Sequence, residues 1–233
     1  MCGRYTATDP EALIDELREL GVAELELELR PRFNVAPGQV VGIVAGDRPE
    51  RLSPARWGLI PLWARRAKGA RPAKPLINAR AETAASKPSF RDAVQRRRCL
   101  VIADGYYEWK REGRAKTPHL FRAQTGRPFA FAGLWAPGDD NDPLRTFAIL
   151  TTEADELTAP IHDRMPVILG PDARARWLAP GEVSASELEA IIGAGAAPAM
   201  TVYPVTQAVG SPAFDEPACV QPVARQPGLF DPR

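Results

Sequence analysis

The chain has 233 residues, 45% of them hydrophobic and 25% charged, which is the composition of an ordinary globular protein. Thirty lysines and arginines against 29 acidic residues give a formal net charge of +1. An anionic partner must therefore be held by a local patch, because the field of the whole molecule is weak. No segment reaches the roughly 18 consecutive apolar residues of a membrane span, so we expect no membrane association and a cytoplasmic location.

Cysteine and histidine are too sparse for a disulfide framework or a familiar metal site. The three cysteines, Cys2, Cys99 and Cys219, are widely separated, and the only histidines are His119 and His162. No CxxC or HxxxH spacing occurs, so we expect no metal and no cofactor.

The elements follow in chain order. Residues 9–21 read as a helix, because Asp9 suits the N-cap, Pro10 the first helical position and Gly21 the end. LELEL at 25–29 is ambiguous between strand and helix. Apolar runs bounded by turn residues then predict strands at 40–46, 57–60, 99–105, 106–110, 119–123, 129–135, 145–152 and 165–170.

Two more helices are expected near the end of the chain, over 171–179 and 184–193. The second would begin with a capping box of Ser186 and Glu189. From about Gly210 the chain is rich in proline, and we expect it to wrap the surface or to fray.

No repeat or low-complexity linker divides the chain, so residues 1–233 are expected to form one α+β domain. REGRAK and QTGRP look like hairpin turns, so most strand pairing should be antiparallel. The predicted architecture is a strongly bent sheet or open barrel flanked by a few helices. The one change in composition is a basic loop at 64–75.

Cys2 lies directly behind the initiator methionine in MCGRYTATDP. Removal of Met1 would leave a free α-amine beside the thiol, a 1,2-aminothiol. The amine, with a pKa near 7.7–8.0, can form an imine with an aldehyde. The thiol can then close on the same carbon to give a thiazolidine. The alternative is an ordinary disordered terminus, although Arg4 and Tyr5 are not typical of one.

Three further segments carry polar groups that could belong to a site. In PLINARAET, Asn78, Arg80 and Glu82 alternate with small residues, so in an extended segment they share one face, which is either a site wall or a solvated edge strand. Glu108 in IADGYYEWK either points to solvent or lies in an apolar pocket that raises its pKa for acid–base work. His162 enters a predicted strand from a loop, where a structural or surface role is the alternative.

Aromatic and basic residues alternate in WGLIPLWARRAKGARPAK at 57–74. Stacking surfaces next to cations suit single-stranded nucleic acid, although tryptophans serve equally well in a core and basic loops are often merely solvated.

Taken together, the motifs resemble the SRAP (SOS-response-associated peptidase) family over nearly the whole chain. They occur in order as MCGRY, RFNVAP, WGLIPLWA, INARAET, RCLVIADGYYEWK, FAGLW, ILTTEA and IHDRMPVIL. Proteins of this family shield abasic sites in single-stranded DNA. After loss of Met1, the resemblance implies, Cys2 condenses with the ring-opened sugar aldehyde to give a thiazolidine crosslink.

The resemblance also implies roles for single residues. Asn78 would orient the terminal amine or the sugar, Glu108 would transfer protons at the amine and ring oxygen, and His162 would assist ring opening. Arg4, Arg80 and Arg164 look like phosphate contacts. Further positions expected at the DNA groove are Asn34, Pro37, Trp63 and Thr151. The partner would be single-stranded DNA, bound by a monomer that associates with the nucleoid on damage.

Two departures from the family pattern affect the DNA path. Ala64 stands where some relatives have a second aromatic residue, so stacking there rests on Trp63. The loop 64–75 is also longer than in some bacterial relatives, and its extra cations are either DNA contacts or solvated.

Three functions remain open from the sequence. The first is the covalent abasic-site protein, with an accompanying lyase activity through the imine. The second is a thiol peptidase or autopeptidase in which Cys2 attacks a peptide carbonyl with His162 or Glu108 as base. The third is a non-covalent single-strand binding module, against which the amine, Glu108 and His162 argue because binding alone does not need them.

Overall fold

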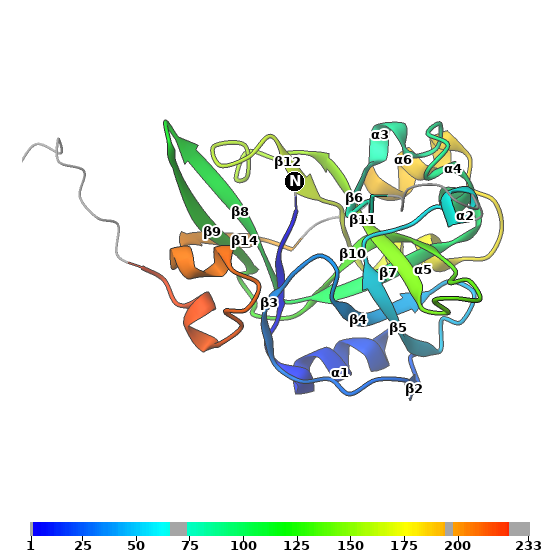
Figure 1. Cartoon of the computed structure of the whole chain (residues 1–233), viewed down its shortest axis with the longest axis horizontal. Coiled ribbons are helices and arrows are strands. Elements are labelled where there is room, and N and C mark those ends of the chain that lie inside the picture. The colour runs from blue at the N-terminus through cyan, green and yellow to red at the C-terminus, as the bar shows by residue number, and fades with distance from the viewer. Residues whose placement is uncertain (1, 66–73, 194–197, 224–233) are drawn as a thin grey trace, which may run out of the picture.

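Two β-sheets form the frame of the computed structural model, which describes residues 2–65, 74–193 and 198–223. In Figure 1 the smaller sheet, which includes the N-terminal strand, lies on the left and the larger sheet lies on the right. Most neighbouring strands are antiparallel, as the hairpin turns predicted. The expected α+β class and the strongly bent sheet are therefore confirmed.

Five strands of the larger sheet close into a ring. They are β4 (Val40–Ala45), β5 (Arg51–Trp57), β7 (Arg98–Ala103), β10 (Phe129–Ala136) and β11 (Arg145–Glu153). Successive pairs β5–β4, β4–β7, β7–β10 and β10–β11 are antiparallel, and the parallel pairing of β11 with β5 completes the barrel. The barrel is thus closed where the sequence predicted an open one. The closing pair joins Phe147 to Trp57, which are far apart in the chain.

Short strands extend this barrel at its margins. They are β2 (Glu24–Leu25) on β5, β6 (Asn78–Arg80) and β12 (Arg164–Pro166) on β11, and β13 (Ile168–Leu169) on β10. The ambiguous LELEL segment contributes only Leu25, at the end of β2, to a strand.

The second sheet has five strands in the order β14, β9, β8, β1, β3. Their bounds are β14 (Met200–Pro204), β9 (Ala115–Ala123), β8 (Gly105–Glu112), β1 (Tyr5–Ala7) and β3 (Arg32–Val35). The hairpin of β8 and β9 is its longest pairing and extends beyond the rest of the sheet (Figure 1).

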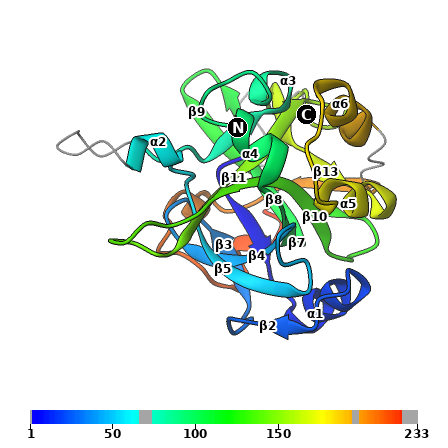
Figure 2. The same ribbon diagram turned by 90° about the vertical axis from the view of Figure 1, so that its right-hand side faces the viewer.

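Helices cover the outside of the frame. Their bounds are α1 (Pro10–Glu19), α2 (Leu62–Arg65), α3 (Ala81–Ala84), α4 (Arg91–Arg96), α5 (Pro171–Leu178) and α6 (Ala185–Gly193), with 3₁₀ turns η1 (Gln207–Gly210) and η2 (Pro217–Val220). Figure 2 shows α5 and α6 on one side of the barrel and α2 on the opposite side. Within the described ranges, no helix combines the length and apolar character that a membrane crossing needs.

Two helix starts show how well local capping could be predicted. At α1, the carboxylate of Asp9 accepts hydrogen bonds from the backbone nitrogens of Glu11 and Ala12, as expected. At α6 the expected capping box of Ser186 and Glu189 is wrong by two residues. Ser184 and Glu187 make it instead, because the helix begins earlier.

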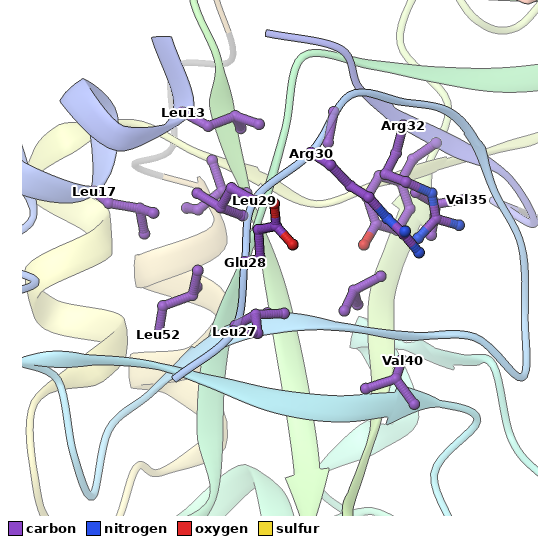
Figure 3. Close-up of a pocket in the computed structure, with 15 residues that line it drawn as sticks. Leu13, Leu17, Leu27, Glu28, Leu29, Arg30, Arg32, Val35, Val40 and Leu52 are labelled. Atoms are coloured by element: carbon purple, nitrogen blue, oxygen red, sulfur yellow. The ribbon is translucent and has the colours of Figure 1, made fainter. Parts of the chain in front are cut away.

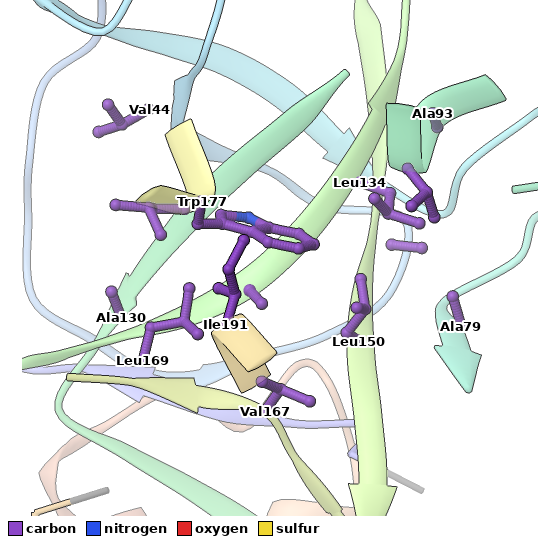
Figure 4. Close-up of a cluster of buried hydrophobic side chains, with 14 of the residues drawn as sticks. Val44, Ala79, Ala93, Ala130, Leu134, Leu150, Val167, Leu169, Trp177 and Ile191 are labelled. Atoms are coloured by element: carbon purple, nitrogen blue, oxygen red, sulfur yellow. The ribbon is translucent and has the colours of Figure 1, made fainter. Parts of the chain in front are cut away.

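Two large apolar clusters lie on opposite faces of the barrel strands. Strand β10 is buried along its whole length, so alternate residues serve alternate clusters. One cluster packs Trp177 of α5 and Ile191 of α6 against Leu134 and Leu150 (Figure 4). The other contains Trp57, Phe131 and Cys2, so the start of the chain belongs to the core.

The proline-rich segment after Gly210 wraps the second sheet as far as it is described, to residue 223. The carboxylate of Asp215 accepts hydrogen bonds from the backbone nitrogens of Phe33 and Asn34, at 2.5 and 2.8 Å, and pairs with Arg32 at 2.7 Å. The alternative of a frayed end can be assessed no further, since residues 224–233 lie outside the described residues.

A cavity of about 360 Å³ opens between α1, the 27–32 segment and β4. Leucines from α1 and from the 27–29 segment line it, and Arg30 and Arg32 lie at its edge (Figure 3). Cys2, Asn78, Glu108 and His162 are all absent from its lining, so the cavity is separate from the expected site.

Candidate active site

Strand β1 carries Cys2 into the space between the two sheets. Tyr5 pairs with Tyr106 of β8 on one side and Val35 of β3 on the other, and Cys2, three residues earlier, is fully buried. Thr6 pairs with Gly105, and a Cβ on that glycine would lie 2.6 Å from the Thr6 hydroxyl. The glycine is therefore needed for β1 to approach β8 this closely.

Asp104 anchors β1, a role that was not anticipated from the sequence, where ADG ends the predicted strand at 99–105. Its buried carboxylate accepts hydrogen bonds from the Thr6 hydroxyl at 2.5 Å and the Thr8 backbone nitrogen at 2.7 Å, and also from the Thr8 hydroxyl. Arg122 lies 3.4 Å from the same carboxylate. These bonds fix the position of β1 and hence of Cys2.

Asn78 holds Cys2 from the barrel side. It begins β6, which runs parallel to β11 with Asn78 opposite Ile149. Its side-chain nitrogen donates a hydrogen bond of 2.8 Å to the carbonyl oxygen of Cys2. The side-chain oxygen is buried and accepts no hydrogen bond from the described residues. The contact is thus to the carbonyl and not to the amine, and an acceptor remains beside the N-terminal residue.

Glu108 approaches from the second sheet. It follows Tyr106 by two positions in β8, so both side chains project toward the cluster that contains Cys2. Only 2% of Glu108 is exposed, and burial raises the pKa of its carboxyl group to about 7. The negative charge of Asp163 acts in the same direction. The buried alternative for Glu108 therefore holds, and near neutral pH both of its protonation states are populated.

His162 lies in the loop between β11 and β12. Its Nδ1 accepts a hydrogen bond of 3.0 Å from the backbone nitrogen of Arg164 and lies 2.9 Å from a carboxylate oxygen of Asp163. A neutral ring can accept the Arg164 N–H at Nδ1, whereas a protonated ring can donate from Nδ1 to Asp163. Nδ1 therefore has a partner in either protonation state. Burial lowers the pKa of the imidazole, which favours the neutral ring with its proton on Nε2.

The Cys2 thiol is held in its protonated form. Burial raises its pKa well above the usual range, and the negative charge of Glu108 raises it further. The sulfur lies 3.9 Å from the carbonyl oxygen of Arg4, within reach of a weak S–H hydrogen bond. This environment is the reverse of the cationic one that activates a thiolate nucleophile.

The expected DNA-contacting residues divide into two groups. Trp63 of α2 is 62% exposed and Arg80 at the end of β6 is also exposed, so both can meet a ligand. Arg4 is half-buried and donates to the carbonyl oxygens of Gly3 and Gly210 at 3.1 and 3.0 Å. Pro37 is partly exposed in the turn before β4.

The other group does not present a free side chain. Asn34 is fully buried, and its amide nitrogen donates to the carbonyl oxygens of Val209, Ser211 and Phe214. Thr151 is also fully buried. In the described structure Asn34 anchors the C-terminal segment and Thr151 lies inside the sheet, so the expected place of these two residues at a DNA groove stays a prediction.

Arg164 is largely buried and forms an ion pair with Glu82. Its guanidinium donates to both carboxylate oxygens of Glu82, at 2.9 and 2.8 Å, and to the Thr151 carbonyl at 2.6 Å. Glu82 does not continue the strand of Asn78 and Arg80 as expected, because β6 ends at Arg80 and Glu82 belongs to α3. Burial raises the pKa of Glu82, but the bonds and charge of Arg164 outweigh it and leave that pKa lowered.

No group of three or more His, Cys, Asp or Glu side chains that could hold a metal ion occurs among the described residues. The basic loop at 64–75 is described only at its ends, since residues 66–73 lie outside the described ranges. What the site does contain is the buried Cys2, the Asn78 amide, the Glu108 carboxyl group with its raised pKa, and the imidazole of His162.

Comparison with known proteins agrees with this arrangement. Residues 1–212 match the family model described as SOS response associated peptidase (SRAP). The chain belongs to the SRAP family. The resemblance of the ordered motifs is thereby confirmed.

Relatives in bacteria and in a vertebrate carry the same description. "Abasic site processing protein YoqW" of Bacillus subtilis is 38% identical, covering 95% of this chain and 99% of its own length. YedK of Escherichia coli, with the same description, is 36% identical over 96% of this chain and 100% of its own. HMCES of Gallus gallus, also called an abasic site processing protein, is 32% identical over 83% of this chain and 67% of its own.

Solved SRAP-like structures share the fold. A protein from Bacteroides thetaiotaomicron superposes with a TM-score of 0.80 and 27% identity, covering 96% of this chain and all of its own. A phage-related protein from Bordetella bronchiseptica gives 0.68 and 32%, covering 88% and 95%.

Proposed function

We propose that this protein recognises abasic sites in single-stranded DNA and binds them covalently through Cys2 once Met1 has been removed. The observation that carries the proposal is the burial of Cys2 between the sheets, held by Asn78 and facing the carboxyl group of Glu108. A disordered terminus would have none of these contacts. The names of the SRAP relatives support an abasic site as the ligand.

The first step joins the α-amine of Cys2 to C1′ of the ring-opened sugar. The amine nitrogen bonds to the aldehyde carbon, and the resulting carbinolamine loses one water to give an imine. Glu108, with a pKa of about 7, can take a proton from the amine and return one to the departing hydroxyl. The neutral imidazole of His162, whose Nδ1 already accepts the Arg164 backbone N–H, can donate a hydrogen bond from Nε2 to the ring oxygen of the closed sugar as the ring opens.

The second step closes a thiazolidine. The sulfur bonds to C1′ while the thiol proton passes to the imine nitrogen, so no atom is lost and no oxidant is required. Since the resting thiol is protonated and lies within the field of the Glu108 carboxylate, that carboxylate is the group we expect to carry the proton. The Asn78 side-chain oxygen, which is buried and accepts no bond from the described residues, can accept a hydrogen bond from the Cys2 nitrogen. Cleavage of the DNA strand at the imine stage would be a side reaction.

The thiol peptidase alternative fits the electrostatics less well. Such an enzyme needs a thiolate, which forms beside a cation or a helix N-terminus. Here burial and the Glu108 carboxylate both raise the pKa of the thiol. The aminothiol reaction does not need a resting thiolate, because the amine attacks first.

Denaturing gel electrophoresis tests the proposal. Purified protein and a single-stranded oligonucleotide with one abasic site should give a heat-stable, slower-migrating band that is lost in Cys2→Ala. Cys219→Ala removes another buried cysteine and is the matched control. If wild type gives no band, or if Cys2→Ala keeps it, the covalent mechanism is wrong and non-covalent binding becomes the better account.

A further inference from the structure

The ion pair between Arg164 and Glu82 lies at the edge of the candidate site. The backbone nitrogen of Arg164 donates to Nδ1 of His162, so this arginine is directly joined to one of the four site residues. Strand β11 lies between β6 and β12. Its residue Thr151 pairs with Arg80 of β6 on one side and with Pro166 of β12 on the other. Arg80 and Arg164 therefore lie on strands that flank the same segment of β11.

Within the ion pair, Arg164 is the buried partner and Glu82 is the solvent-exposed one. The Arg164 side chain is 11% exposed and is oriented by the Thr151 carbonyl at 2.6 Å. The Glu82 side chain is 43% exposed, and its further contact is a 3.5 Å one from the Thr152 hydroxyl. Rotation of Glu82 would place its carboxylate in water, whereas Arg164 would be left as a mostly buried charge that needs another anion.

A phosphate fits the same donors. The two parallel N–H groups that Arg164 presents to the Glu82 oxygens, at 2.9 and 2.8 Å, match the spacing of two phosphate oxygens as well as that of a carboxylate. This pair of N–H groups, called the Arg164 fork below, can bind only one anion at a time. The Glu82 carboxylate and a phosphate therefore compete for it.

We propose that Glu82 is an internal competitor for DNA: in the free protein its carboxylate occupies the guanidinium donors of Arg164 that take a backbone phosphate when a strand binds. The inference rests on the proposed function only for its ligand, a single DNA strand. Binding then proceeds by exchange of one anion for another. Part of the gain from the phosphate contact at Arg164 is offset by loss of the internal pair, so Glu82 lowers the affinity for undamaged strands.

Glu82→Gln tests this, with Glu153→Gln as its matched control. Glu153 is exposed and lies directly opposite Arg164 in the β11–β12 pairing, and no side-chain hydrogen bond joins it to Arg164 in the described structure. Both variants remove one negative charge from the same region. The probe is an undamaged single-stranded oligothymidine, so no covalent step contributes, and the measurement is the dissociation constant by fluorescence anisotropy.

Glu82→Gln should bind this strand about fivefold more tightly than Glu153→Gln, because only the former releases the Arg164 fork. The excess should vanish when Arg164 is also changed to Lys, which keeps the charge but lacks the fork. Equal affinities for the two glutamine variants would overturn the proposal. So would weaker binding by Glu82→Gln, since Glu82 would then be holding Arg164 in place for DNA. Neither result depends on whether wild type forms a crosslink with abasic DNA, which tests the proposed function separately.

Discussion

Burial of the Glu108 carboxyl group lowers the stability of the folded chain at and above neutral pH. Its carboxyl group has a pKa of about 7 in the folded chain against an ordinary value of 4.5, because burial disfavours the charged form. The folded state therefore binds this proton more tightly than the unfolded state does. The free energy of unfolding must fall as the pH rises from about 4.5 to about 7, and the full loss of about 3 kcal/mol is present above that range.

Glu108→Gln should remove this pH dependence. Measured by urea unfolding, the stability of the variant relative to wild type should increase by about 3 kcal/mol between pH 4.5 and pH 8. Glu156→Gln, at an exposed carboxylate, controls for the loss of a negative charge. A constant difference between Glu108→Gln and wild type across this range would mean that Glu108 is not buried as described.

The hydrogen-bond and ion-pair partners of individual side chains were the features hardest to predict from the sequence. Burial of Glu108 could be proposed as one of two alternatives, because apolar residues flank it. The pairing of Arg164 with Glu82 could not, since it depends on where β6 ends and α3 begins. The anchoring role of Asp104 was hidden because its partners Thr6 and Thr8 are remote in the chain.

At the scale of elements, the C-terminal segment is attached to β3 by the buried side chain of Asn34 and the partly buried side chain of Asp215. The two N–H groups of the Asn34 amide are shared among three backbone carbonyls of residues 209–214, at 2.8 to 3.1 Å, and Asp215 binds the backbone of β3 in return. These bonds make the segment part of the second sheet's packing, although its sequence is rich in proline and resembles a tail.

Asn34→Ala should therefore act on stability and not on DNA contacts. Loss of the amide leaves buried carbonyls without a donor, so we expect the free energy of unfolding to fall by about 2 kcal/mol or more. The dissociation constant for single-stranded DNA at a fixed salt concentration should match that of wild type. Unchanged stability together with weaker binding would place the Asn34 side chain among the DNA contacts.

Most elements could be predicted because their signals are local. The Asp9 cap, the Pro10 start and the alternating apolar runs each depend on a few neighbouring residues, and they reproduce α1 and the main strands. Closure of the barrel could not be predicted in this way, because β5 and β11 meet in parallel across a long stretch of chain. The site was predicted largely through the resemblance, since the residues that form it lie in four separate segments.

At the scale of the whole molecule, a net charge of +1 contributes little electrostatic affinity for DNA. Under the proposed function, binding before the reaction should depend on a few local arginines and should weaken as salt is raised. The proposed covalent bond would not be weakened by salt. Contact with intact strands should therefore be transient, and contact with damaged strands should be permanent.

The order in which salt is added should separate these two stages. Sodium chloride at about 1 M, added before abasic single-stranded DNA, should strongly reduce the rate of adduct formation. The same salt added after the reaction should release no adduct, as measured on denaturing gels. Equal loss in both orders would indicate that the complex is held by charge alone.

The intact mass of the adduct is the most direct test of the central claim. Mature wild-type protein, confirmed by mass to begin at Cys2, should combine with an abasic oligonucleotide to give the sum of the two masses less one water, without any reductant. Cys2→Ser can form the imine but not the thiazolidine, so it should yield a stable adduct only after borohydride reduction. A stable unreduced adduct in Cys2→Ser, or equal adduct from protein that retains Met1, would contradict the account.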